Sequence, residues 1–353
     1  MHIKIIDRLS QFDKIKMNWD NLYSIDFNAN VTNSWAWMKG WLESTKNNWF
    51  VIAVKLKSNE EFISFFPLVY GKPKQSDANS KIDTIYYAGV PHIDYASFVC
   101  HPEYENEAIM KIAEYLDKKI KWNKFFINSF RDKRLEILIE HFKNNGFEII
   151  KRETTPCPYV KLPDSWSEYF AELPSKNFRR KITRLTNKTK RENFVINTAD
   201  NESIDNYIKI LLELYEMRWG QQSNQELLTF KNILKSCFNH KKLLLDMMWQ
   251  EDQAVAGLAS FVDKRKGTIA SFILVWNDLY KSYSPGQLMK INQIRYAIKH
   301  NYREYDFMRG DEDYKYQFNA FNRYTDNCVI IRKNLYYFLG RILRLVSAKK
   351  INI

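Results

Sequence analysis

The chain has 353 residues, of which 45% are hydrophobic and 15% aromatic, and its formal net charge is +13. This length and composition suit two folded domains and exclude a disordered chain. The longest apolar runs, residues 62–70 and 268–276, are too short to cross a bilayer, and Asp7 precedes any signal-peptide core, so we expect a cytoplasmic protein.

The first half of the sequence predicts a mixed α/β domain. Amphipathic, tryptophan-rich patterns favour helices over residues 13–23 and 34–45. Apolar runs separated by polar, glycine or proline residues then predict four strands, over residues 49–56, 62–69, 84–88 and 95–100. The remaining predicted elements of this half are a helix over 102–119, a strand over 124–131, a helix over 135–144 and a strand over 147–151.

A proline-rich run, Thr154 to Pro158, interrupts this pattern, so we predict domains over residues 1–155 and 156–353. The second domain is predicted to begin with helices over 166–173 and 175–192. Its next elements are a strand over 194–198, helices over 204–219 and 225–238, and strands over 243–250, 254–263 and 268–276. A helix over 285–300, strands over 304–309 and 328–332, and a C-terminal helix over 335–351 complete the prediction.

The two halves have the same order of elements. In each, paired strands lead to a helix that begins at a proline, and then to a strand with similar residues, at 126–132 and 305–311. A duplicated α/β unit is the economical explanation.

The net charge and the cysteine spacing indicate which partners and ligands to expect. A charge of +13 favours polyanionic partners such as nucleic acid, anionic lipid or a phosphate-bearing substrate, although solubility alone would also explain it. The four cysteines are scattered without metal-ligand spacing, so we expect no bound metal.

The helix predicted at residue 285 has an informative start. Ser284 fits an N-cap, Pro285 the first helical position, and Gln287 the third residue of a capping box. Gly286 leaves the backbone open to close approach, and the free N–H groups of a helix start suit a pyrophosphate. A capping box would occupy the same N–H groups, so an ordinary capped helix stays open as the alternative.

Acidic residues, Arg309 and Lys315 cluster around Gly310 after this helix. Asp306 falls within the predicted strand 304–309, and burial disfavours the ionised form of a carboxylate, which suits a general base. A salt bridge to Arg309 is the structural alternative for Asp306. A solvated turn is the alternative for the acids that follow, at residues 311–313.

Two segments are strongly basic. The helix over 175–192 has no acid before Glu192, and Arg180 and Arg184 lie one turn apart on it. It is either a solvated cationic face or a clamp for phosphates of a nucleotide sugar, a lipid-linked sugar or tRNA. The helix over 335–351 either packs on the sheet or lies on the anionic inner face of the membrane. No motif for sequence-specific DNA binding is present, so we expect no DNA partner.

The run from Ser284-Pro285-Gly286 to Asp306, followed by Arg309-Gly310-Asp311-Glu312 and Tyr314-Lys315, resembles a branch of the GNAT superfamily. This is the BioF2-like or CelD/BcsL-type branch, related to the FemAB peptidoglycan aminoacyltransferases. The resemblance is strong over residues 158–318 and architectural over the first half. It implies an α/β, mixed α+β fold with tandem GNAT-like (FemAB-like) domains, each a mostly antiparallel mixed sheet flanked by helices.

The resemblance also implies a function. An N-acyltransferase of this kind moves an acyl group from acyl-coenzyme A, a co-substrate and not a permanently bound cofactor, to an amine. The acceptor would be a small molecule or saccharide, here an amino sugar of an envelope polysaccharide or its precursor. An aminoacyl-tRNA-dependent transferase of FemAB type and a non-catalytic GNAT-like assembly module are the alternatives.

The implied site lies in the second domain. The residues expected at the coenzyme A pyrophosphate are Ser284, Gly286, Gln287 and Leu288. The candidate bases are Asp306 and Asp311, and Lys315 or Tyr316 would stabilise charge or protonate the leaving thiolate. The residues expected to bind the substrate are Arg180, Arg184, Arg218, Trp219, Arg309 and Tyr314.

Overall fold

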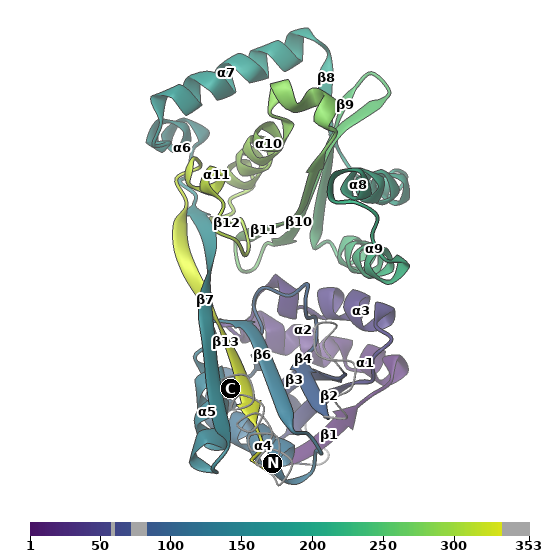
Figure 1. Cartoon of the computed structure of the whole chain (residues 1–353), viewed down its shortest axis with the longest axis vertical. Coiled ribbons are helices and arrows are strands. Elements are labelled where there is room, and N and C mark those ends of the chain that lie inside the picture. The colour runs from purple at the N-terminus through teal and green to yellow at the C-terminus, as the bar shows by residue number, and fades with distance from the viewer. Residues whose placement is uncertain (58–60, 72–82, 334–353) are drawn as a thin grey trace, which may run out of the picture. The chain divides into compact units, whose positions relative to one another are not determined.

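The computed structural model describes residues 1–57, 61–71 and 83–333 (Figure 1). The chain forms two compact units. Unit 1 comprises Met1–Ala29, Lys46–Thr154 and Thr325–Ile353, and unit 2 comprises Asn30–Thr45 and Thr155–Tyr324. The main division falls beside the predicted boundary, but each unit also takes a segment from the other side of it. None of the helices in the described ranges is long and apolar enough to cross a membrane.

Unit 1 is a sheet covered by helices, with strand order β1-β2-β3-β4-β6-β13-β7. The strands are β1 (His2–Ile6), β2 (Trp49–Lys55), β3 (Phe62–Tyr70), β4 (Thr84–Tyr87), β5 (Val99–Cys100), β6 (Lys124–Phe130), β7 (Glu148–Lys161) and β13 (Phe321–Ile331). The helices are α1 (Leu9–Lys14), α2 (Lys16–Ile25), α4 (Glu105–Lys118) and α5 (Arg134–Asn144), with a 3-10 turn η2 (Pro102–Tyr104). β4 runs parallel to β6.

Unit 2 has strand order β7-β12-β11-β10-β9-β8. The further strands are β8 (Phe194–Thr198), β9 (Leu243–Gln250), β10 (Gln253–Asp263), β11 (Thr268–Trp276) and β12 (Glu304–Asp306). The helical elements are η1 (Val31–Asn33), α3 (Trp35–Ser44), α6 (Trp166–Glu172), α7 (Lys176–Arg191), α8 (Ile204–Trp219), α9 (Asn224–Asn239), η3 (Asp278–Tyr283), α10 (Pro285–Lys299) and α11 (Asp313–Tyr316).

Both units contain a parallel strand pair with one long helix between its members in sequence. In unit 1 the pair is β4 and β6, and in unit 2 it is β11 and β12. The other strand pairs of unit 2 are antiparallel. The predicted fold class, tandem mixed sheets flanked by helices, is confirmed. The C-terminal helix predicted over 335–351 lies outside the described residues.

The two units exchange strands. β7 leaves unit 1 and pairs with β12 in unit 2, where Tyr159 lies opposite Asp306. β13 leaves unit 2 and pairs with β6 in unit 1, where Cys328 lies opposite Ile127. Each sheet is therefore completed by a strand that the chain reaches only by crossing between the units.

The proline-rich run predicted as a break is part of the 14-residue strand β7, so that prediction is wrong. The carbonyls of Pro156 and Pro158 accept hydrogen bonds from the N–H groups of Gly310 (3.0 Å) and Phe307 (2.9 Å). Each proline lacks an N–H donor, but its carbonyl still accepts a hydrogen bond, so the strand continues through both residues.

Helix α3 belongs to unit 2 because it packs on α9. An ideal Cβ at Gly40 would lie 2.5 Å from the carbonyl oxygen of Asn232 and 2.6 Å from Cα of Ile233. The hydroxyl of Ser236 on α9 also donates to the carbonyl of Ala36 at 2.7 Å. The missing side chain at Gly40 lets the two helix backbones approach closely.

We therefore expect Gly40→Ala to lower the free energy of unfolding by about 1–3 kcal/mol, because backbone atoms of α9 must move. Alanine is otherwise the better helix former, so a gain in stability would contradict this packing. Gly71→Ala is the control, since its Cβ would meet only the Asn47 side chain at 3.5 Å or more. Urea unfolding followed by circular dichroism measures both variants.

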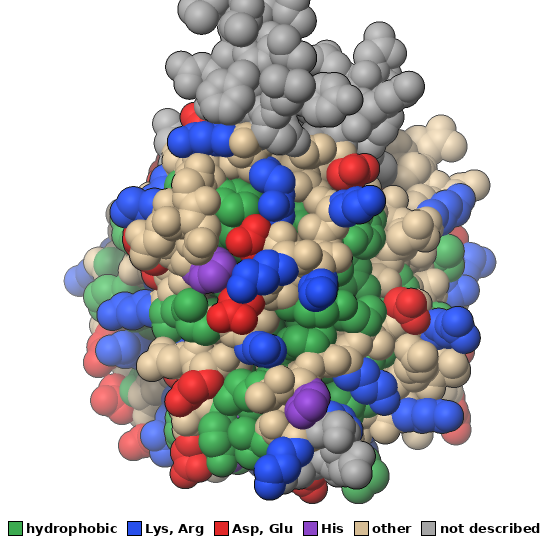
Figure 2. All heavy atoms as spheres, turned by 90° about the horizontal axis from the view of Figure 1, so that it is seen from below, with side chains coloured by type: hydrophobic (Ala, Val, Ile, Leu, Met, Phe, Trp, Pro, Cys, Tyr) green, Lys and Arg blue, Asp and Glu red, His purple; other side chains and the backbone are tan. Residues whose placement is uncertain are grey.

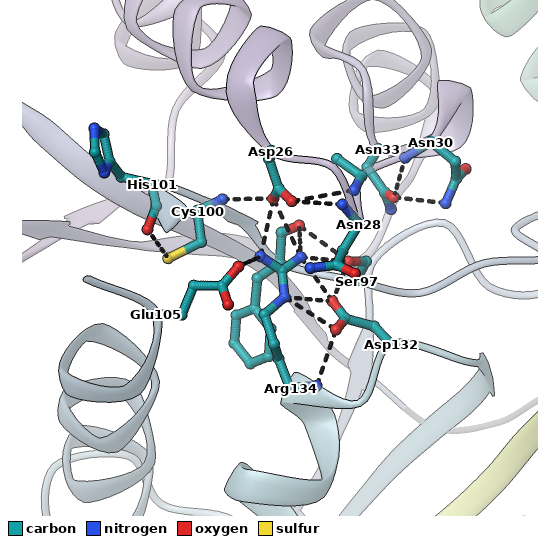
Figure 3. A network of polar contacts seen from close by, with 12 residues as sticks. Asp26, Asn28, Asn30, Asn33, Ser97, Cys100, His101, Glu105, Asp132 and Arg134 are labelled. Atoms are coloured by element: carbon teal, nitrogen blue, oxygen red, sulfur yellow. Dashed lines mark hydrogen bonds and ion pairs between the residues drawn. The ribbon is translucent and has the colours of Figure 1, made fainter. Parts of the chain in front are cut away.

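A buried ion cluster joins four segments of unit 1 around Arg134 (Figure 3). The Arg134 side chain is 5% exposed, and its guanidinium lies 3.1 Å from Asp26, 2.8 Å from Asp132 and 2.7 Å from Glu105. Asp26 also accepts the N–H of Cys100 at 2.8 Å. The cluster ties the end of α2, the segment around Cys100, the start of α4 and the start of α5 to one another.

Candidate active site

The parallel pair of unit 2 separates after three residues. β11 pairs with β12 over Thr268–Ala270 but continues to Trp276. Within the described part of the chain, no strand covers the β11 edge from Ser271 onward. Uncovered backbone N–H and C=O groups of this edge are available to a ligand.

The separation has a local cause at Asp306. Its carboxylate accepts the N–H of Met308 at 2.7 Å, and Met308 and Gly310 have positive φ angles of 61° and 122°. This Asx-type turn leads the chain away from β11. The predicted strand 304–309 therefore ends at Asp306, and that part of the prediction is wrong.

Helix α10 begins beside the uncovered edge. Ser284 has left-handed backbone angles (φ 49°, ψ 53°), and no side chain of the described residues caps the helix. The predicted capping box is therefore wrong. The Gln287 amide instead accepts from Lys181 Nζ at 2.7 Å and donates to Gln317 at 3.0 Å. The N–H groups of Gln287 and Leu288 are 3.0 and 3.3 Å from the Ser284 carbonyl.

Gly286 is explained by packing. An ideal Cβ there would lie 2.9 Å from the Trp276 ring at the end of β11. The Arg218 guanidinium lies 3.4 Å from the centre of the same ring and pairs with Asp278 at 3.3 Å. The structure thus brings Arg218 to the start of α10. Trp219 is 60% exposed and Leu288 is buried in the core.

The basic helix α7 carries positive charge to this region. Its apolar residues Phe178, Ile182 and Leu185 are buried, as predicted, and Lys181 reaches Gln287. Burial and then the charge of Arg184 lower the pKa of Lys181. The sequence pattern of α7 does not distinguish Lys181 from the other cations of the helix.

Arg180 and Arg184 lie elsewhere on α7, in an open groove between α6 and α7. The groove is lined by Trp166, Ser167, Phe170, Ala171, Lys176, Arg179, Arg180, Thr183, Arg184 and Asn187, and contains no acidic side chain. The face drawn in Figure 2, by contrast, has basic and acidic side chains interspersed.

The predicted acids have structural contacts. The Asp306 carboxylate accepts the Met308 N–H of its own turn and lies 3.8 Å from the Arg323 guanidinium. Asp311 is exposed and accepts from the Tyr316 hydroxyl, which also reaches Asn322 at 3.0 Å. Burial and the hydrogen bond to Asp311 raise the pKa of Tyr316. Arg309 is exposed.

Lys315 is buried under the turn that follows β12. Its amine donates to the carbonyls of Met308, Arg309 and Gly310 at 3.2, 3.1 and 3.1 Å, and pairs with Glu312 at 2.8 Å. All three N–H donors of the amine therefore have partners, and the side chain holds the turn in place; we call this structural role a clamp. Its predicted catalytic role stays a prediction.

Lys290 belongs to none of the sequence motifs described above. It is 2% exposed, on the sheet-facing side of α10, and its amine lies 3.5 Å from the Ser271 hydroxyl. The Phe307 and Tyr314 ring centres are 4.9 and 5.1 Å away. Burial, followed by the charge of Lys315, lowers its pKa to about 7. The available signal was a lysine among apolar residues, between Met289 and Ile291, one turn after Gly286.

Comparison with known proteins gives a family for part of this region. The profile of the acetyltransferase (GNAT) domain matches residues 175–316, which is less than half of the chain and runs from the start of α7 to the end of α11. No curated protein matches the sequence.

Solved structures extend the likeness in fold to almost the whole chain. FemX is similar with a TM-score of 0.64 and 13% identity, over 96% of this chain and 99% of FemX. L-PGS from Bacillus licheniformis is similar with a TM-score of 0.53 and 11% identity, over 87% of this chain and 91% of L-PGS. The chain therefore carries an acetyltransferase (GNAT) domain within a tandem GNAT-like fold.

Proposed function

We propose that this protein is an N-acyltransferase that moves an acyl group from acyl-coenzyme A to an amine, such as an amino sugar of an envelope polysaccharide or its precursor. The observation that carries the proposal is the uncovered β11 edge beside the start of α10. The N–H groups of such an edge can bind the oxygen that becomes negative when an amine attacks a thioester. The acceptor class and the BioF2-like branch rest on the sequence resemblance alone.

The donor is proposed from the charge at the same place. The first turn of α10 has no side-chain cap, and Lys181 lies beside it with Arg184 near enough to affect its pKa. A helix start flanked by cations suits the pyrophosphate of coenzyme A. The acyl group would then extend along β11 toward the point where the two strands separate.

Calorimetric titration with acetyl-coenzyme A and longer acyl-coenzyme A species tests the donor. We expect binding that is weakened about tenfold or more in the double variant Lys181→Glu, Arg184→Glu, because charge-assisted contacts to phosphate contribute about 1.5–3 kcal/mol each. Lys231→Glu, at an exposed position of α9, should leave the affinity unchanged. Gly286→Glu is a poor test, since its Cβ would meet Trp276. Failure of every species to bind would overturn this donor.

An aminoacyl-tRNA donor is the second candidate, and the groove between α6 and α7 favours it. Trp166 and Phe170 offer aromatic rings beside the cations of Lys176, Arg180 and Arg184, a combination that suits single-stranded RNA. Treatment of a reconstituted reaction with RNase should abolish transfer if this candidate is right. It should leave transfer unchanged if the donor is acyl-coenzyme A.

A further inference from the structure

Lys290 lies where the two strands of the parallel pair part. The Lys290 amine lies 3.5 Å from the hydroxyl of Ser271, which is the first β11 residue beyond the pairing. The same amine faces the ring of Phe307, which is the first residue after β12. This amine therefore lies beside the point where the uncovered β11 edge begins. Lys290 lies on α10 only one turn after Gly286, so the same helix carries both the proposed pyrophosphate site and this amine.

The surroundings of this amine do not suit a permanent ammonium ion. Its three donors have one long contact, to Ser271, and no carboxylate of the described ranges lies within ion-pair distance. The groups that face it are the Tyr314 ring, the ammonium of Lys315 and, farther away, Glu312, which already pairs with Lys315. A buried charge without a partner is costly, so the neutral amine is favoured, and its lone pair can accept a proton.

We propose that Lys290 is the general base of the acyl transfer, accepting a proton from the attacking amine and returning it to the leaving group. This inference rests on the proposed function but not on the donor. It assigns the proton transfer to a group whose surroundings favour the neutral form. Asp306 and Asp311, in contrast, are held in a turn and on the surface.

With a thioester donor, the atoms and electrons of this step balance. The acceptor nitrogen forms a bond to the carbonyl carbon, the π electrons move to the oxygen, and Lys290 Nζ takes the proton that the nitrogen loses. When the carbonyl re-forms, the C–S bond breaks with its electrons on sulfur. The Lys290 ammonium then protonates the thiolate, which leaves an amide, a thiol and a neutral lysine.

The kinetic test compares Lys290→Met and Lys290→Arg with Lys299→Met, an exposed lysine on the same helix. We expect both Lys290 variants to lose about 10²–10⁴-fold in kcat with unchanged donor affinity, because removal of a general base has this effect. The wild-type kcat/KM should fall as the pH drops below about 7, where Lys290 becomes protonated. Transfer by Lys290→Met within threefold of wild type would overturn the assignment and leave the proposed function intact.

Thermal unfolding gives a readout without substrate. Folding lowers the pKa of Lys290 from an unfolded value of about 10.4 to about 7. The buried ammonium ion therefore destabilises the folded state fully below pH 7, and this destabilisation shrinks as the pH rises toward 10. Lys290→Met should therefore raise Tm above wild type by more at pH 6 than at pH 9. A Tm difference that does not change with pH would overturn the neutral lysine. Failure of wild type to acylate any amine would overturn the proposed function and the base with it.

Discussion

Replacing Arg134 with methionine should lower the free energy of unfolding by about 3–5 kcal/mol, since it leaves buried carboxylates without their counter-charge. The side chains of Asp26 and Asp132 are 0% and 3% exposed, and both bind the guanidinium. Burial opposes the charge on Arg134, but the carboxylates of Asp132 and Asp26 outweigh it and raise the pKa of the guanidinium. Urea unfolding by circular dichroism measures the loss, and the soluble yield on expression should fall with it.

Two further variants sharpen this test. Arg134→Lys keeps the charge but loses the planar fork that contacts three carboxylates, so its stability should lie between wild type and Arg134→Met. Lys151→Met removes an exposed pair with Glu136 and should cost no more than about 1 kcal/mol. Equal losses for Arg134→Met and Lys151→Met would show that burial does not set the strength of the cluster.

Lys315→Met should reduce both stability and transfer. The change leaves three consecutive carbonyls, from Met308 to Gly310, without their shared donor. Hydrogen bonds to charged groups contribute about 1.5–3 kcal/mol each, so we expect a loss of at least about 3 kcal/mol, measured by urea unfolding. Transfer should fall at least tenfold, because the released turn lies where β11 and β12 separate, beside the proposed site.

This variant also separates two roles for Lys315. A clamp predicts that stability and activity fall together. A residue that only stabilises charge on the reacting atoms predicts a loss of kcat with unchanged unfolding. The second result would support the catalytic role inferred from the family resemblance and contradict the clamp.

Periodicity and turn residues were sufficient to predict most elements and the duplicated plan, because apolar patterns decide which face of an element is buried. They failed where the chain uses backbone groups in unusual ways. Pro156 and Pro158 interrupt a pattern but not a strand, because their carbonyls still accept. The strand at residue 304 ended early because Asp306 binds the Met308 N–H, a contact that spacing alone does not predict.

The sequence predicted segments that contact one another in the structure, but not the partners of their charged side chains. The motif from Ser284 to Tyr316 identifies the segments that meet, but the partners of each charge depend on three-dimensional contacts. Lys315 is engaged by three carbonyls, while Lys290, not selected from the sequence, has one weak contact in the core. Charge alone could not distinguish these two lysines, and neither could burial, since both are 2% exposed; their hydrogen-bond partners differ.

The exchange of strands has a consequence for biosynthesis. Because β13 pairs with β6, the sheet of unit 1 stays incomplete until the ribosome has made all of Thr155–Tyr324. At about 5–20 residues per second this delay is roughly 10–30 s. During that time β6 presents an open edge on the nascent chain, the kind of edge that pairs with other chains. We therefore expect newly made chains to need protection of that edge until β13 has been synthesised.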